Sequence, residues 1–118
     1  MKKKERNYVL YLEDILLAMN RIAEYIEGHS LEGFKKDYKT VDAVIRNFEV
    51  IGEASKNIAI SLKEKYPDVP WQEMYSLRNK ISHEYFGIDY EIIWDLPYNY
   101  LPENKKQISE IIENLKDS

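Results

Sequence analysis

The residues between Leu77 and Gly87 include side chains suited to acid–base chemistry on a phosphodiester. An arginine stands at Arg78, and one of the two histidines of the chain stands at His83. An imidazole titrates near neutral pH and can move a proton, whereas a guanidinium binds phosphate and stabilises charge that develops on it. The pair therefore suits cleavage of RNA by attack of the 2′-hydroxyl on its neighbouring phosphate, a reaction that requires no metal.

A helix from about Pro70 to about Glu84 is expected to position these residues. At about 100° per residue, its buried stripe consists of Trp71, Met74, Leu77, Ile81 and Tyr85. Arg78 falls at about 40° from Met74, inside this stripe, so its charge needs a partner. Glu49 and Glu53, which flank the apolar stripe of the preceding helix, are the candidate partners.

Asn79 and His83 share another face of the same helix, because they are four residues apart. This face is expected at the surface or at an interface with a second subunit. Arg78 and His83 lie roughly 140° apart around an ideal helix. A dimer across this surface would bring two Arg/His sets together and would ease that geometry.

Composition limits the classes of protein that this chain can be. Its 118 residues and 14.1 kDa fit a single domain over residues 1–118. The absence of cysteine excludes disulfides, thiolate zinc sites and a cysteine nucleophile. No apolar run approaches the roughly 18 residues of a membrane span, and neither a set of metal ligands nor a cofactor motif is evident. We therefore expect a soluble, cytoplasmic protein that needs no cofactor.

The net charge of −4 argues against binding of a long nucleic acid through neutralisation of many phosphates. Contact with RNA is therefore expected to be local and made by a few cations at one site.

Apolar periodicity predicts an all-α fold, an up-and-down bundle of four to five helices. Gly28 is expected to end the first helix and Gly52 to allow another helix to approach closely. Ser30, Thr40 and Asp89 are the expected N-caps. Four helical segments are expected before residue 85: Arg6 to about Glu27, Leu31 to about Asp37, Thr40 to about Lys65, and Pro70 to about Glu84. A further segment begins at Asp89 and must kink or divide at Pro97 and Pro102. The last helix includes Ile108 to Leu115.

The stretch from Arg78 to Tyr85 reads R-x4-H-x-Y. Together with the stretch from Val44 to Ser55, this motif resembles the HepT-like toxins of HEPN/MNT toxin–antitoxin systems, whose motif and second-helix signature have these forms. Further similarity lies at Pro70-Trp71, at Tyr85 to Asp89 and at Ile92-Ile93-Trp94.

The resemblance implies a homodimeric, metal-independent endoribonuclease with a composite cleft between its subunits. Arg78 would bind the scissile phosphate, His83 would transfer protons, and Asn79 would orient the substrate or His83. It also implies an MNT-type nucleotidyltransferase antitoxin that silences the toxin by AMPylation of Tyr85.

A second class of function remains open from the sequence alone. In this alternative the chain is a non-catalytic HEPN module that binds a nucleotide or partners a nucleotidyltransferase. The acidic net charge favours the alternative slightly, whereas the complete set of Arg78, Asn79, His83 and Tyr85 favours the ribonuclease. Each residue also has a structural interpretation: an ion pair for Arg78, a hydrogen-bonded histidine for His83 and a packed tyrosine for Tyr85.

Overall fold

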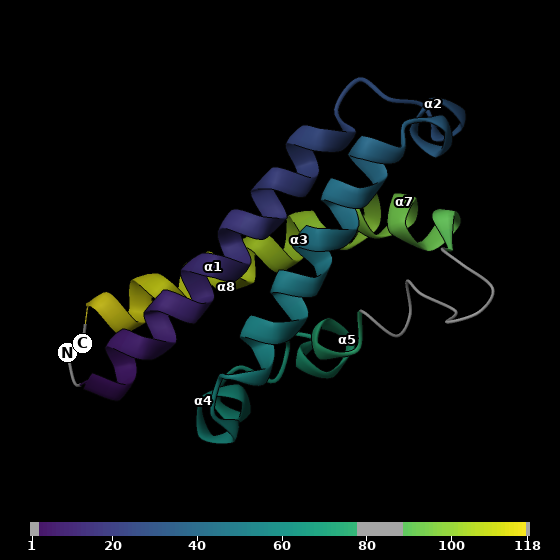
Figure 1. Cartoon of the computed structure of the whole chain (residues 1–118). Coiled ribbons are helices and arrows are strands. Elements are labelled where there is room, and N and C mark those ends of the chain that lie inside the picture. Colours follow the sequence, from purple (N-terminus) through teal and green to yellow (C-terminus); the bar gives the residue numbers. More distant parts are fainter. Residues whose placement is uncertain (1–2, 78–88, 118) are drawn as a thin grey trace.

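The structure, a computed structural model, describes residues 3–77 and 89–117. Within those ranges every regular element is a helix (Figure 1), which confirms the predicted all-α fold class. The helices are α1 (Lys3–Ile26), α2 (Leu31–Lys36), α3 (Tyr38–Lys56), α4 (Ile60–Lys65), α5 (Trp71–Tyr75), α7 (Tyr90–Asn99) and α8 (Leu101–Lys116).

The core forms where α1 and α3 pack against each other in opposite directions, with α8 along the other side of α1 (Figure 1). Phe48 and Ile51 of α3 and Leu12 and Met19 of α1 are fully buried. Burying a side chain of this size stabilises the fold by about 1.5–3 kcal/mol. The C-terminal end of α8 lies beside α1, because Lys116 Nζ is 3.9 Å from Glu13 Oε2.

The N-caps follow the sequence prediction at two of three helices. Ser30 caps α2 by accepting a hydrogen bond from the Gly33 amide, and Asp89 caps α7 by accepting one from the Ile92 amide. The prediction for α3 was wrong, because Asp37 is its cap. The Asp37 carboxylate accepts from the Thr40 amide at 3.2 Å and from the Thr40 hydroxyl at 2.7 Å. Thr40 thus stands three residues inside the helix, where its backbone N–H still needs an acceptor.

The single helix expected from Thr40 to Lys65 is wrong, because the chain turns between α3 and α4. The Asn57 side chain donates to the Glu53 carbonyl at 2.9 Å, and Ala59 is extended with ψ of 148°. Asparagine bonds to nearby backbone and so favours helix ends over helix interiors. The turn costs little apolar burial, since Ile58 within it and Leu62 just after it are both buried.

The glycine and proline predictions are confirmed at the helix ends. Gly28 follows α1 with φ of 81°, a left-handed conformation that suits glycine. The C-terminal part divides at Tyr100, and Pro102 lies in the first turn of α8. Pro97 is accommodated inside α7, where it is buried.

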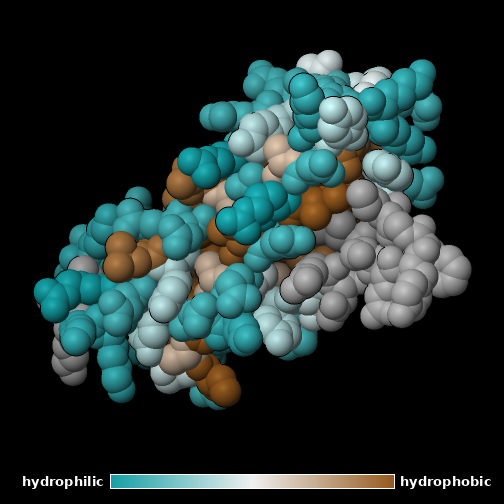
Figure 2. All heavy atoms as spheres, in the orientation of Figure 1, coloured by the Kyte–Doolittle hydropathy of each residue, from teal (hydrophilic) through white to brown (hydrophobic). Residues whose placement is uncertain are grey.

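The face shown in Figure 2 is mostly hydrophilic, with apolar side chains along its middle and a few separate ones at its edges. In the described part of the chain, no helix combines the length and the apolar character that crossing a membrane requires.

The cap at Asp37 predicts an acid-dependent component of stability. Both hydrogen bonds from Thr40 lower the pKa of Asp37 below its ordinary value of 3.8. A group whose pKa is lowered by folding stabilises the native state above its unfolded pKa, and this contribution disappears as the pH falls through the folded pKa. The difference in unfolding free energy between wild type and Asp37→Asn should therefore be constant above about pH 5 and should change as the pH falls below it.

Urea unfolding between pH 2.5 and pH 6 measures this difference. Asp42→Asn, which removes an exposed carboxylate from the same helix, is the matched control. A difference between wild type and Asp37→Asn that does not vary with pH would contradict the assigned cap.

Candidate active site

The predicted site residues fall into two groups. Arg78, Asn79, His83 and Tyr85 lie outside the described residues, so the predicted ion pair of Arg78 with Glu49 or Glu53 stays a prediction. Glu49 and Glu53 lie on the outer face of α3, the first half-buried and the second exposed. The structure also places Leu77, the residue that precedes Arg78 in the chain.

Helix α5 lies unusually close to α3, and Gly52 makes this approach possible. A Cβ atom at Gly52 would lie 3.3 Å from the carbonyl oxygen of Tyr75 and 3.4 Å from that of Met74. The predicted close approach of another helix at this glycine is thereby confirmed. The Trp71 indole holds the other end of α5, since its Nε1–H donates to the Tyr66 carbonyl at 3.0 Å.

The burial of the first residues of the predicted stripe is confirmed, but the single helix expected from about Pro70 to about Glu84 is wrong, because α5 ends at Tyr75 and Ser76 is its C-cap. Trp71, Met74 and Leu77 are 8%, 3% and 6% exposed and belong to the hydrophobic core. The chain is therefore firmly anchored up to the residue before Arg78, and Ile81 and Tyr85 of the same predicted stripe lie outside the described residues.

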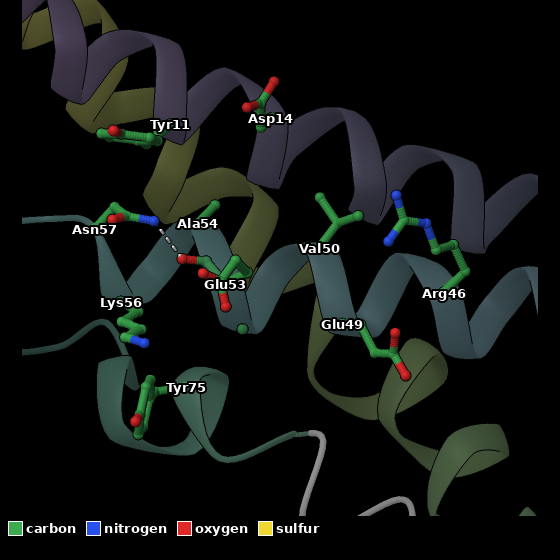
Figure 3. A pocket seen from close by; sticks show the side chains of 11 residues that line it. Tyr11, Asp14, Arg46, Glu49, Val50, Glu53, Ala54, Lys56, Asn57 and Tyr75 are labelled. Atoms are coloured by element: carbon green, nitrogen blue, oxygen red, sulfur yellow. Dashed lines mark hydrogen bonds between the residues drawn. The ribbon is translucent and has the colours of Figure 1, made fainter.

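A groove of about 570 Å³ runs along α3 between α1 and α5 (Figure 3). Glu49 and Glu53 both line it, and Tyr75 projects from α5 on the side of Lys56. The two carboxylates are four residues apart, which places them one helical turn apart on the same face. The full lining is Tyr11, Asp14, Arg46, Glu49, Val50, Gly52, Glu53, Ala54, Lys56, Asn57 and Tyr75.

The groove carries charges of both signs, and in residues 3–77 and 89–117 they form no ion pair with one another. Arg46 and Lys56 stand at either end of the α3 segment, with Glu49 and Glu53 between them. The carboxylates are thus available to bind a guanidinium, and the cations are available to bind phosphate or carboxylate.

Sequence reasoning missed the contributions of α1 and α5 to this groove. Tyr11, Asp14 and Tyr75 come from elements far from Glu53 in the sequence, and only the pairing of helices brings them together. It also missed that Asn47 is buried. Asn47 and the buried Ser55 each satisfy their donor within α3: Asn47 Nδ2 donates to the Ala43 carbonyl and Ser55 Oγ to the Ile51 carbonyl. These two polar residues therefore have structural roles.

The second histidine, His29, lies in the loop between α1 and α2. Its Nε2 is 3.4 Å from Asp37 Oδ2, at the first turn of α3, and the groove begins further along that helix. Over the described ranges, no group of three or more histidine, aspartate or glutamate side chains is arranged to hold a metal ion.

Comparison with known proteins places the chain in a family. The model of the family described as Ribonuclease HepT-like matches residues 15–111. This chain belongs to the HepT-like ribonuclease family. The matched range includes the groove residues Glu49 and Glu53 and the whole stretch from Arg78 to Tyr85.

Curated relatives of this HepT-like chain are similar over almost their full length. A protein of Methanocaldococcus jannaschii, named as a presumed RNase, is 47% identical over 98% of this chain and 94% of its own. A protein of Caldanaerobacter subterraneus subsp. tengcongensis with the same kind of name is 42% identical over 90% and 95%. A protein of Thermococcus cleftensis, named a probable ribonuclease HepT, is 40% identical over 91% and 97%. No solved structure matches this chain.

The contact at Gly52 predicts a measurable loss of stability when the glycine is enlarged. Gly52→Val should lower the free energy of unfolding by about 1–3 kcal/mol, because the new side chain meets backbone carbonyls that cannot rotate away. Gly52→Ala should have a smaller effect, since its single methyl requires a shift of only tenths of an ångström and gains about 1 kcal/mol of helix propensity.

Urea unfolding measures both variants, and Glu53→Val, an exposed β-branched substitution in the same helix, controls for the helix propensity of valine. If Gly52→Val were no less stable than Glu53→Val, this result would contradict the close approach of α5 to α3 at Gly52.

Proposed function

We propose that this HepT-like chain is a metal-independent endoribonuclease toxin, one domain whose Arg78 and His83 act on the RNA phosphodiester. The observation that carries the proposal is the family match, which spans the complete R-x4-H-x-Y motif. Membership of a ribonuclease family supports RNA cleavage, and the names of the curated relatives agree with it.

The proposed reaction is an internal transfer of the phosphoryl group. The 2′-oxygen forms a bond to phosphorus, the bond from phosphorus to the 5′-oxygen breaks, and the products are a 2′,3′-cyclic phosphate and a free 5′-hydroxyl. His83 serves the proton transfers, Arg78 stabilises the charge on the phosphoryl oxygens, and Asn79 orients the substrate or His83. This reaction consumes no water and requires no metal ion.

The active unit in this proposal is a homodimer whose two motifs line one cleft. An interface with two-fold symmetry pairs a surface with itself, so the surface must be self-complementary. The groove of α3 supports such a pairing, because Arg46 and Lys56 lie on the same face as Glu49 and Glu53 without ion pairs among the described residues.

Silencing is proposed to occur at Tyr85 by an MNT-type nucleotidyltransferase. The phenolic oxygen attacks the α-phosphorus of ATP, AMP is transferred to the tyrosine, and pyrophosphate leaves. The adenylate adds bulk and negative charge two residues from His83, where an RNA phosphate must bind.

The decisive prediction concerns the two histidines. Wild-type protein should cleave mixed cellular RNA in EDTA, and His83→Ala should lower the rate by about 100-fold or more, because proton transfer by a positioned side chain contributes about 10²–10⁴-fold. His29→Ala is the matched control and should retain wild-type activity, since His29 lies against Asp37 outside the groove.

Intact mass must first show that the preparation carries no adenylate, and sedimentation should show a dimer. Equal cleavage by wild type and His83→Ala would contradict the catalytic assignment. Unmodified wild type that cleaves no RNA would favour the alternative, a non-catalytic HEPN module that binds a nucleotide or partners a nucleotidyltransferase.

The modification site has its own prediction. Incubation with ATP and the cognate nucleotidyltransferase should add the mass of AMP to wild type and should abolish RNA cleavage, whereas Tyr85→Phe should remain unmodified because it lacks the nucleophilic oxygen. Tyr38→Phe is the control, since Tyr38 is 69% exposed and should not affect the reaction. Equal addition of AMP to Tyr85→Phe would show that another residue is the acceptor.

A further inference from the structure

Helix α5 is only five residues long, so contacts with the rest of the protein must hold it in place. A helix of this length is not stable by itself, because few hydrogen bonds compensate for the fixed backbone. The C-terminal end of α5 is held where the carbonyls of Met74 and Tyr75 lie close to Gly52. Its N-terminal end is continuous with the loop at residues 66–70, which leads from α4 into Trp71.

The loop at residues 66–70 is well defined by its own bonds. Pro67 and Pro70 each fix a backbone φ angle. The Tyr66 carbonyl accepts two hydrogen bonds, one from the Val69 amide at 3.2 Å and one from the Trp71 indole at 3.0 Å. The loop and the start of α5 therefore move as one unit, and a contact with the loop also restrains α5.

Gln107 of α8 makes such a contact. Its Nε2 donates to the backbone carbonyl of Asp68 at 3.0 Å, although the two residues are 39 positions apart in the sequence. The backbone of Gln107 is itself firmly placed, because the next residue of α8, Ile108, is fully buried. Asn114 Nδ2 adds a bond of 3.3 Å to the Tyr66 hydroxyl, which restrains a side chain rather than the backbone of the loop. Gln107 thus links the loop to the body of the helical bundle.

The Gln107 amide contributes little to the stability of the fold. Its Oε1 is buried and accepts no hydrogen bond within residues 3–77 and 89–117. A buried acceptor without a partner costs free energy, which offsets much of what one hydrogen bond contributes. Asp68 is an exposed residue, so water can bond to its carbonyl in place of Gln107. The main consequence of the bond is therefore the position that it gives to the loop.

We infer that Gln107 is a positioning residue of the proposed ribonuclease, because it holds the loop that determines where α5 lies and from where the chain continues into Arg78. This inference rests on the proposed function. Leu77 provides the connection, since it is buried two residues after the end of α5 and directly before Arg78. A displacement of about 1 Å at a reacting group can slow a reaction about 100-fold, even when its cause is far from the chemistry.

The kinetics of RNA cleavage by Gln107→Met test the inference. Methionine has an unbranched side chain of similar length, and it lacks both the amide donor and the unpartnered acceptor. Gln107→Met should therefore unfold in urea like wild type, because the lost bond and the removed acceptor compensate each other. It should lower kcat about tenfold and change KM less than about twofold, since it displaces reacting groups and leaves the groups that only bind RNA.

Gln72→Met is the matched control, because it makes the same substitution on α5 itself. Gln72 is exposed, and its Nε2 donates to the Ser76 hydroxyl at 3.3 Å, one helical turn away. The control variant thus loses a local hydrogen bond in place of the bond to α8. Its kcat should stay within about twofold of wild type, since the loop at residues 66–70 keeps its contact with Gln107.

Hydrogen exchange gives a measurement that does not depend on RNA. The Met74 amide donates to the Pro70 carbonyl at 2.9 Å. This amide should exchange faster in Gln107→Met than in wild type or in Gln72→Met, because the start of α5 opens more often.

A lower kcat together with faster exchange at Met74 would support the positioning role of Gln107. Wild-type kcat in Gln107→Met, a change confined to KM, an equal loss of kcat in Gln72→Met, or unchanged exchange at Met74 would each overturn it. If wild type itself cleaves no RNA, the proposed ribonuclease fails and so does a role of Gln107 in that reaction. Exchange at Met74 would then still show whether Gln107 holds α5.

Discussion

The contact between α3 and α5 at Gly52 is the constraint on which the candidate site depends. A Cβ atom at residue 52 would lie only 3.3 and 3.4 Å from two backbone carbonyl oxygens at the end of α5. Backbone cannot rotate out of the way as a side chain can, so the position of α5 relative to α3 is closely defined. Leu77 is buried just beyond this contact, and Arg78 follows it directly. The glycine in the middle of α3 thus costs helix propensity but determines where the motif begins.

The same contact explains why α3 has two different faces. Its inner face buries Val44, Phe48 and Ile51 against the core. Its outer face carries charges of both signs along a groove, and among residues 3–77 and 89–117 these charges form no ion pair with one another. Exposed charges contribute little to folding. In the proposed function, these side chains serve contact with the substrate or with a second subunit.

How far the sequence predicted the structure depended on the range of the interactions. Local patterns predicted the helical class, the caps at Ser30 and Asp89, the stop at Gly28 and the buried start of the stripe at Trp71. Two local features were missed because more than one polar residue nearby could form them. Asp37, and not Thr40, is the cap of α3, and the Asn57 side chain ends this helix by bonding to the Glu53 carbonyl. Tyr11 and Tyr75 could not be assigned to the groove, since no sequence spacing reports which helices become neighbours.

The distribution of charge resolves an apparent conflict between an acidic chain and an RNA substrate. Net charge describes the field far from the molecule, whereas binding depends on charges within about a Debye length of the contact, roughly 8–10 Å at physiological salt. The excess of carboxylates lies in residues 89–104, and the rest of the chain, including the groove of α3, is balanced or mixed in sign. Local cations can therefore hold a phosphate at one site even though the chain as a whole is acidic.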